Sequence, residues 1–357
     1  MGERWGGHSG VTARLPQTQE QALAVPNRGE VTRQRCHPAV EKSSGGWSSA
    51  RSFRPTNEPR TGPALSIVSR ETSSVLDEGR YVDDYMYVEP EQPSSFFRPF
   101  PRVLSVANQK GGVGKTTTAI NLGAALAELG DRVLIVDLDP QGNATTGLGV
   151  NARLLERSIY DVLMHDIPLE DCVEATSVRN LFVAPTTIDL AGAEIELVPA
   201  FSREGKLKRA LQKVVDDYDW VFIDCPPSLG LLTINALTAS SEVIVPIQCE
   251  YFALEGLGQL VRNVALVQTN LNPTLEISAI VLTMYDARTK LADQVMREVK
   301  VHFGDRVCRT IVPRSVRLSE APSFGQPITV FDPASRGALA YRDLAKEVRG
   351  GTTERTR

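Results

Sequence analysis

Residues 108–118, NQKGGVGKTTT, combine glycines, lysines and threonines in an order that can bind phosphate. A common phosphate-binding loop reads G-x-x-x-x-G-K-[ST], and residues 114–116 match its end. The first glycine of that pattern should stand at position 109, where this sequence has Gln109, and an additional lysine follows at Lys110. The segment therefore predicts a phosphate site that carries one more lysine than the common pattern.

The chemistry of this loop suits the phosphates of a nucleotide. Its glycines permit backbone angles that let successive N–H groups turn toward phosphate oxygens, and the following helix adds positive potential at its N-terminus. Lys115 would reach the β- and γ-phosphates, Thr116 would coordinate Mg²⁺ through its hydroxyl, and Thr117 would hydrogen-bond the α-phosphate. The loop residues predicted to contact the nucleotide are Lys110, Gly111, Gly112, Val113, Gly114, Lys115, Thr116 and Thr117.

Two apolar runs that end in acids predict the metal side of the same site. Residues 133–141 read VLIVDLDPQ, and residues 220–227 read WVFIDCPP. Acids at the carboxyl ends of parallel strands lie in the crevice where α/β sheets bind ligands. Asp224 fits the role of holding Mg²⁺, and Asp137 or Asp139 would be free to orient an attacking water. The alternative for each acid is a helix or turn cap.

After residue 101, short apolar runs alternate with helix-like stretches. Runs of four to eight apolar residues without polar alternation are typical of strands buried on both faces. The pattern predicts an α/β fold, a three-layer α/β/α P-loop NTPase with a mostly parallel central sheet. Strands are expected near 103–107, 133–137, 181–184, 220–224, 243–246 and 277–282, and helices near 116–129, 203–217, 231–239, 254–269, 291–303 and 335–348.

Composition bounds the organisation of the chain. The 357 residues are 42% hydrophobic and 23% charged, with a net charge of −4, so a sizeable core is expected. Residues 1–100 are rich in proline, glycine, serine and arginine and predict a disordered N-terminal extension, followed by one domain over 101–350 and a short disordered tail over 351–357. Five scattered cysteines and the lack of an apolar leader or membrane-length run fit a cytoplasmic protein.

Several motifs together resemble the ParA/Soj family of chromosome-partitioning ATPases. This family belongs to the deviant Walker-A group, which also includes MinD, and the likeness runs from about residue 102 to about residue 348. The matching segments are KGGVGKTTT at 110–118, DLDPQGN at 137–143, DLAGAE at 189–194, FIDCPP at 222–227, TMYDART at 283–289, PRSVRLSEAP at 313–322 and YRDLA at 341–345.

The resemblance implies a role for the additional lysine. In the family, the lysine matched by Lys110 crosses a dimer interface and contacts the ATP of the other subunit, as an arginine finger would. Gly111 and Gly112 would leave room for that crossing. The resemblance assigns the positioning of water to Asp139, with Asp137 its near neighbour. Met284 and Pro313 are candidates for the adenine pocket by position alone.

A basic surface is the predicted contact for DNA. Residues 286–317 hold eight Lys/Arg and four Asp/Glu, which suits sequence-independent phosphate contacts, although an ordinary solvated helix face would look similar. The resemblance matches Arg288 and Arg317 to positions that contact DNA in the ATP dimer, with Arg314 and Lys290 as helpers. It implies an ATP-dependent homodimer that binds nonspecific double-stranded DNA at the nucleoid, with hydrolysis stimulated by a ParB-type partner.

Other readings remain open from the sequence. A MinD-type membrane-associated ATPase would need an amphipathic C-terminal helix, and the apolar-poor end of this chain disfavours it, so no membrane partner is expected. An electron carrier like the nitrogenase iron protein would need cluster cysteines, for which Cys225 and Cys249 lack the spacing. A plasmid-borne switch that also represses its operon would need an N-terminal helix-turn-helix. Residues 68–72, VSRET, could record a partner-binding palindrome in the gene.

Overall fold

The computed structural model describes residues 100–250 and 253–350. The segments expected to be disordered, apart from Phe100, and residues 68–72 lie outside the described part. The strands are β1 (Arg102–Val106), β2 (Val133–Asp137), β3 (Glu174–Ala175), β4 (Leu181–Ala184), β5 (Trp220–Asp224), β6 (Glu242–Gln248) and β7 (Glu276–Thr283). The α-helices are α1 (Lys115–Glu128), α2 (Asn143–Gly147), α3 (Ile159–His165), α4 (Leu190–Glu196), α5 (Lys206–Leu211), α6 (Leu231–Ala239), α7 (Ala253–Asn270), α8 (Lys290–Phe303), α9 (Val316–Glu320), α10 (Ile328–Phe331) and α11 (Arg336–Arg349).

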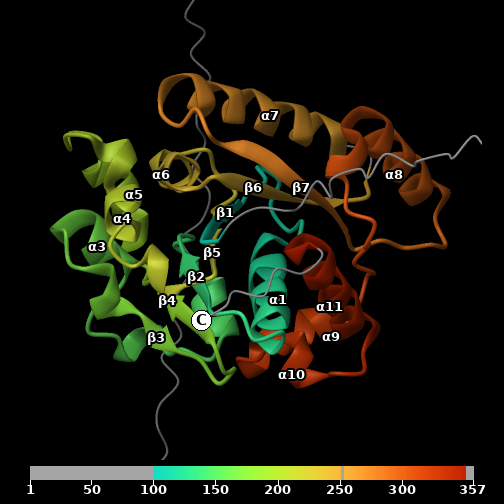
Figure 1. Ribbon diagram of the computed structural model, residues 1–357, viewed down its shortest axis with the longest axis horizontal. Helices are drawn as coiled ribbons and strands as arrows, with labels where there is room; N and C mark the ends of the chain where they lie inside the picture. The colour runs from blue at the N-terminus through green and yellow to red at the C-terminus, as the bar shows by residue number, and fades with distance from the viewer. Residues whose placement is uncertain (1–99, 251–252, 351–357) are drawn as a thin grey trace, which may run out of the picture. The chain divides into compact units, whose positions relative to one another are not determined.

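The strands form one sheet in the order β3-β4-β2-β5-β1-β6-β7. All neighbouring pairs are parallel except β3 with β4, which is antiparallel. Because parallel strands require crossover connections, the helices between them cover the sheet on both faces. Figure 1 shows α7 on one side of the sheet and α1 with α11 on the other. The predicted three-layer α/β/α fold with a mostly parallel sheet is confirmed.

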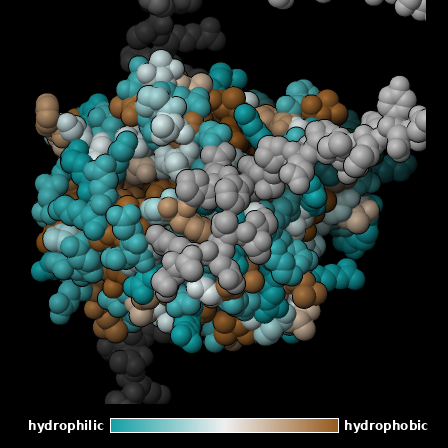
Figure 2. All heavy atoms as spheres, in the orientation of Figure 1, coloured by the Kyte–Doolittle hydropathy of each residue, from teal (hydrophilic) through white to brown (hydrophobic). Residues whose placement is uncertain are grey.

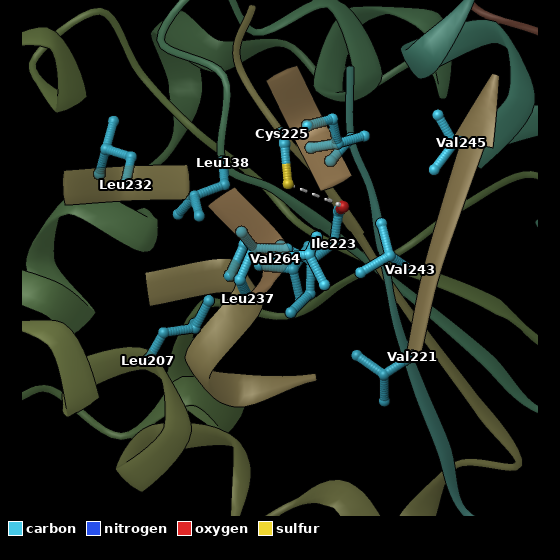
Figure 3. Packing of buried hydrophobic residues seen from close by; sticks show 14 of the residues in the cluster. Leu138, Leu207, Val221, Ile223, Cys225, Leu232, Leu237, Val243, Val245 and Val264 are labelled. Atoms are coloured by element: carbon cyan, nitrogen blue, oxygen red, sulfur yellow. Dashed lines mark hydrogen bonds between the residues drawn. The ribbon is translucent and has the colours of Figure 1, made fainter. Parts of the chain in front are cut away.

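Successive residues of each strand point into two separate apolar layers. In β2, Val133 and Ile135 face the cluster that contains α1 and α11, whereas Leu134 and Val136 face the cluster that contains α6 and α7. Strands buried on both faces in this way carry the unbroken apolar runs seen in the sequence. Figure 3 shows part of the second layer, where strand residues lie against Leu232, Leu237 and Val264. In the same view the thiol of Cys225 donates to the carbonyl of Ile223 over 3.6 Å.

Helix α1 carries the glycine-rich loop and packs very closely on the sheet. A Cβ added at Gly123, in the middle of α1, would lie 2.8 Å from the Cδ1 of Ile135 on β2. A side chain at this position would force the end of Ile135 to shift, and glycine avoids that clash despite its cost of about 1 kcal/mol in a helix. This close contact fixes the height of the N-terminus of α1 above the carboxyl ends of the strands.

Most expected elements are confirmed, but one expected long helix is divided into shorter segments. The structure splits the expected helix over 203–217 into α5 between two short 3-10 turns, Arg203–Gly205 and Val215–Asp217. The left-handed Ser202 and the Gly205 that follows it break the helical path there. Sequence reasoning also missed β3 and five short helices, α2, α3, α4, α9 and α10, which are too short for a clear apolar period.

We expect Gly123→Val to lower the free energy of unfolding by about 1–3 kcal/mol, because the new side chain overpacks the contact between α1 and β2. Urea unfolding of the full chain measures this loss. Ile135→Val removes the methyl group that lies nearest, so the double variant should lose less than the sum of the two single losses. Strict additivity would show that the contact does not limit the approach of α1 to the sheet.

Candidate nucleotide-binding site

Hydrogen bonds attach the glycine-rich loop to two segments that are distant in the sequence. Asn108 donates from Nδ2 to the carbonyl of Pro246 over 2.8 Å and accepts the backbone N–H of Lys110 over 3.0 Å. The hydroxyl of Thr283, at the end of β7, donates to the carbonyl of Val113 over 2.8 Å. The loop is thus attached to β6 and β7 by hydrogen bonds within the described residues.

The glycines of the loop fall into two kinds. Gly112 (φ 75°) and Gly114 (φ 89°) adopt left-handed backbone angles that disfavour any other residue. Gly111 has no such angle, and an added Cβ there would meet nothing within 4 Å in the described chain. Nothing among the described residues therefore requires a glycine at position 111, and the space beside it within that part of the chain is open to a ligand or to another molecule.

Lys115 is the first residue of α1, and its side chain is buried beside the loop. Its ammonium lies 3.4 Å from the carbonyl of Lys110, inside the curve of the loop. Burial lowers the pKa of Lys115, and the negative charges of Asp224 and Asp139 partly oppose that shift. The loop therefore encloses a largely buried ammonium that interacts with the charges of nearby carboxylates.

The two acids at the ends of β2 and β5 lie opposite each other, because the parallel register pairs Asp137 with Asp224. Asp137 is fully buried and accepts hydrogen bonds from the backbone N–H and the hydroxyl of Thr145, over 2.7 and 2.6 Å. Burial raises the pKa of Asp137 to about 6, against an ordinary 3.8. The remaining acid, Asp139, is also buried and accepts the backbone N–H of Gln141 over 3.0 Å.

Asp224 differs from the other two acids of the site in its lack of hydrogen bonds to the described part of the chain. It is fully buried, and neither of its carboxylate oxygens has a hydrogen-bond partner among the described residues. Burial raises its pKa well above the ordinary value and the charge of Asp137 raises it further, while the nearby hydroxyl of Thr116 and the charge of Lys115 oppose part of that shift. A buried, unpartnered carboxylate beside a hydroxyl-bearing loop is a donor set that suits Mg²⁺, which prefers oxygen ligands and retains several waters. The residues present therefore fit the metal that the sequence predicts.

Lys110 points away from its own loop. Its ammonium forms an ion pair of 2.6 Å with Glu250, which follows β6, and both side chains are partly exposed. Glu250 carries no sequence signature for this contact, since 140 positions separate the two residues. The position of Lys110 on the open side of the loop, beside Gly111, leaves it accessible to an anion that arrives from outside the chain.

A cavity of about 290 Å³ opens beside Gly114 and Thr117. Met284 and Pro313 both line it, so the structure brings the two candidates for the adenine pocket together next to the phosphate loop. Met284 adopts a left-handed angle (φ 50°), which is rare for its residue type and is typical of ligand sites. Sequence reasoning missed other lining residues, Gln248, Thr283, Ser315, Val316, Leu318, Ser319 and Tyr341 among them.

The four predicted DNA contacts occupy two segments that meet. A parallel bridge joins Tyr285 to Pro313, and the backbone N–H of Arg314 donates to the carbonyl of Tyr285 over 3.0 Å. This contact places the stretch with Arg288 and Lys290 alongside the stretch with Arg314 and Arg317, and all four side chains are exposed. The face drawn in Figure 2 is mainly hydrophilic, with scattered apolar side chains. Among the described residues, no helix has the length and apolar content needed to cross a bilayer.

Comparison with known proteins relates much of this chain to known families. Residues 101–277 match a family model described as an AAA domain. The sporulation initiation inhibitor protein Soj of Bacillus subtilis (strain 168) is 61% identical over 247 residues, which are 69% of this chain and 98% of that protein. The chromosome partitioning protein ParA of Caulobacter vibrioides (strain NA1000 / CB15N) is 53% identical over 249 residues, 69% of this chain and 93% of that protein.

Two solved structures are similar to this chain in sequence and fold. Cobyrinic acid a,c-diamide synthase from Mycobacterium smegmatis, solved with a bound ATP analog and magnesium, is 44% identical with a TM-score of 0.60. The similarity covers 68% of this chain and 92% of that chain. The septum site-determining protein MinD from Pyrococcus horikoshii OT3, complexed with Mg-ADP, is 29% identical with a TM-score of 0.56, over 69% of this chain and 95% of that one.

Asp224→Asn should stabilise the protein in the absence of nucleotide, because it removes a buried charge without a partner. A carboxyl whose pKa is raised on folding makes the folded state bind more protons than the unfolded state between the two pKa values, so stability falls as pH rises through that window. A gain of about 1 kcal/mol in the free energy of unfolding corresponds to roughly 2–4 °C in melting temperature. We therefore expect the melting temperature of Asp224→Asn to exceed that of the parent by at least this amount at pH 7.5.

The same comparison near pH 4 should show little difference, because both forms are then neutral at this position. Asp216→Asn is the matched control: Asp216 is exposed and forms no ion pair with the described residues, so its replacement should leave the melting temperature unchanged at both pH values. A lower melting temperature for Asp224→Asn at pH 7.5 would contradict the view of Asp224 as an uncompensated charge.

Proposed function

The chain belongs to the ParA/Soj family of chromosome-partitioning ATPases, and on that basis we propose that it is an ATP-dependent DNA-partitioning switch. ATP binding joins two copies in a sandwich dimer, the dimer binds nonspecific DNA, and hydrolysis stimulated by a ParB-type partner releases the DNA. Such a protein acts in the cytoplasm at the nucleoid.

The observation that carries the proposal is the loop with Lys115 inside it and three buried acids beside it. The backbone N–H groups of residues 111–117 and the ammonium of Lys115 would bind the phosphates, and the cavity beside Met284 and Pro313 would take the adenine. Thr116 and Asp224 would hold Mg²⁺, which neutralises charge on the phosphate oxygens when bound. A bound Mg²⁺ would also give the carboxylate of Asp224 the partner that it lacks among the described residues.

Lys110 is proposed to act on the nucleotide of the second copy. The open space at Gly111 supports this role, because the loop presents Lys110 on its outer side rather than over its own Lys115. To reach a phosphate, the ammonium must leave Glu250, and the ion pair is exposed enough to exchange at low cost. A second cation at the γ-phosphate stabilises the charge that develops during transfer.

Asp139 is proposed to position the attacking water. Of the two acids at the end of β2, Asp137 has both oxygens bonded: Oδ2 accepts both groups of Thr145, and Oδ1 accepts the backbone N–H of Asp139. Asp139 has one carboxylate oxygen bonded to Gln141 and the other without a recorded hydrogen bond in the described residues. That second oxygen can accept a proton from water. A slow basal rate suits a switch, because the ATP-bound state must persist until the partner arrives.

The basic surface of Arg288, Lys290, Arg314 and Arg317 is proposed to contact DNA phosphates. Such contacts are weak singly and decline with salt. Joining two copies places two such surfaces on one molecule, so the second contact occurs at high effective concentration. DNA affinity would then report the nucleotide state.

The experiment that tests the proposal is co-sedimentation of the full chain with DNA in the presence of ADP or ATP. We expect DNA binding with ATP only, and its loss in Lys110→Ala and in Arg317→Glu. Arg157→Glu is the matched control, because Arg157 is an exposed, ion-paired arginine on a different part of the surface and should bind as the parent does. Equal binding with both nucleotides would contradict the switch.

A second expectation separates dimerisation from hydrolysis. Asp139→Ala should retain ATP-dependent dimers by size-exclusion chromatography with light scattering. Its phosphate release should fall at least tenfold, which corresponds to about 1.4 kcal/mol of barrier per power of ten. Unchanged turnover in this variant would show that another residue positions the water.

A further inference from the structure

Two of the four basic side chains on the proposed DNA surface are already bound to carboxylates of their own chain. The guanidinium of Arg288 forms a bidentate pair with Asp286, with Nε to Oδ1 at 2.8 Å and Nη2 to Oδ2 at 2.6 Å. The backbone N–H of Arg288 also donates to the same carboxylate over 3.1 Å. The side chain of Arg288 is nevertheless 86% exposed, so its other face is open to solvent.

Arg317 is held in a similar way by two acids. Its Nη1 donates to Glu320 over 3.1 Å, and its Nε lies 3.4 Å from the Oδ2 of Asp332. The guanidinium also lies 5.8 Å from the centre of the Phe331 ring. These acids come from two different segments, α9 and the residue after α10, so Arg317 is paired on two sides although its side chain is 58% exposed.

The other two cations differ. Arg314 and Lys290 are exposed, and neither side chain has an ion pair or hydrogen bond within residues 100–250 and 253–350. The charge of Arg314 does reach Asp286, whose pKa it helps to lower, but without a direct contact. The pairing is therefore selective for the arginines matched to DNA-contacting positions. The guanidinium of Arg288 lowers the pKa of Asp286 well below its ordinary value, so this acid remains ionised wherever the protein would bind DNA.

We propose that Asp286, Glu320 and Asp332 are internal competitors of DNA phosphate, which hold Arg288 and Arg317 until two copies act together. The inference rests on the proposed DNA contact and adds the regulation of that surface. A carboxylate and a phosphate present the same paired oxygens to a guanidinium, so one can replace the other. An exposed pair weakens a competing contact only by roughly two- to fivefold, but a dimer has to exchange four arginines.

This competition makes DNA binding depend on the number of cations that act together. A single copy would exchange its pairs for phosphates with little net gain and would bind DNA poorly. In a dimer, the unpaired Arg314 and Lys290 of both copies bring DNA to the surface first, and the exchange at Arg288 and Arg317 then follows at high effective concentration. The acids thereby steepen the dependence of DNA binding on dimerisation.

Fluorescence anisotropy with a labelled random-sequence duplex tests the proposal, using the full chain with ADP and with ATP. We expect Asp286→Asn and Glu320→Gln each to raise DNA affinity by about two- to fivefold, and Asp286→Asn/Glu320→Gln/Asp332→Asn to raise it at least tenfold with ADP. The ratio of affinities with ATP and ADP should shrink accordingly. Asparagine and glutamine keep an acceptor oxygen for the backbone and solvent, so the fold should persist, as circular dichroism would verify.

The matched control is Asp305→Asn, which adds the same charge within the same basic segment but frees no arginine, since Asp305 is exposed and has no recorded partner in the described chain. Its effect should be below twofold. In the background of Arg288→Ala, the gain from Asp286→Asn should disappear.

Equal gains from Asp305→Asn and Asp286→Asn would overturn the competition and leave net charge as the cause. A gain from Asp286→Asn that persists in Arg288→Ala would also overturn it. If the parent binds DNA with ATP and the acid variants bind no better, the inference fails while the proposed function stands. If the parent binds no DNA with ATP, the proposed function itself fails, and the inference fails with it.

Discussion

The parallel register between β2 and β5 is the constraint on which the rest of this structure depends. It sets the carboxylates of Asp137 and Asp224 opposite each other at the buried end of the sheet, with Asp139 two residues further on. Two like charges side by side in a dry interior oppose folding unless one is protonated or a cation is near. Lys115 supplies part of that cation from the start of α1, and it can do so only because Gly123 lets α1 approach β2 closely. The apolar layers on both faces of the sheet therefore support a site that is itself electrostatically incomplete.

The sequence predicts the features that depend on local pattern and leaves out those that depend on long-range contact. The strands were predictable because residues such as Leu134, Ile135 and Val136 are buried on one face or the other without polar alternation. Helix α3 had a readable start, since Ser158 and Asp161 form a capping box, but its seven residues are too few for a clear apolar period. Lys115 and Asp224 could be selected as candidate site residues from their types and order, and the structure places both beside the loop. The pairing of Lys110 with Glu250 could not, because it follows from where the end of β6 lies in the sheet. The left-handed backbone of Met284 has no signature in its residue type either.

The end of β7 connects the phosphate loop with the basic surface over four consecutive positions. Thr283 holds the carbonyl of Val113, and Met284 lines the cavity next to Gly114. Tyr285 then pairs with the strand-like stretch that carries Pro313 and Arg314, and Asp286 holds Arg288. A change in the loop on nucleotide binding would therefore reach the basic surface through one short, hydrogen-bonded segment. This proximity is a physical route between the two sites, and coupling along it requires only that the segment have two arrangements that the nucleotide distinguishes.

The ion pairs of the molecule differ in burial, and burial decides which of them can exchange partners. Arg102 and Glu242 form a pair with side chains only 2% and 1% exposed, and Arg102 also lies over the ring of Trp220 and donates to the carbonyl of Val348. Breaking that pair would leave an uncompensated charge in the core, so the pair is a fixed link between β1 and β6, and the bond to Val348 joins it to α11. Lys110 with Glu250, Arg288 with Asp286 and Arg317 with Glu320 are all partly or largely exposed, so water and salt already weaken them. A cation that must meet phosphate only after two copies join is best kept in such a pair. It is neutralised enough to limit premature contact, and it is released by any anion that offers a better geometry.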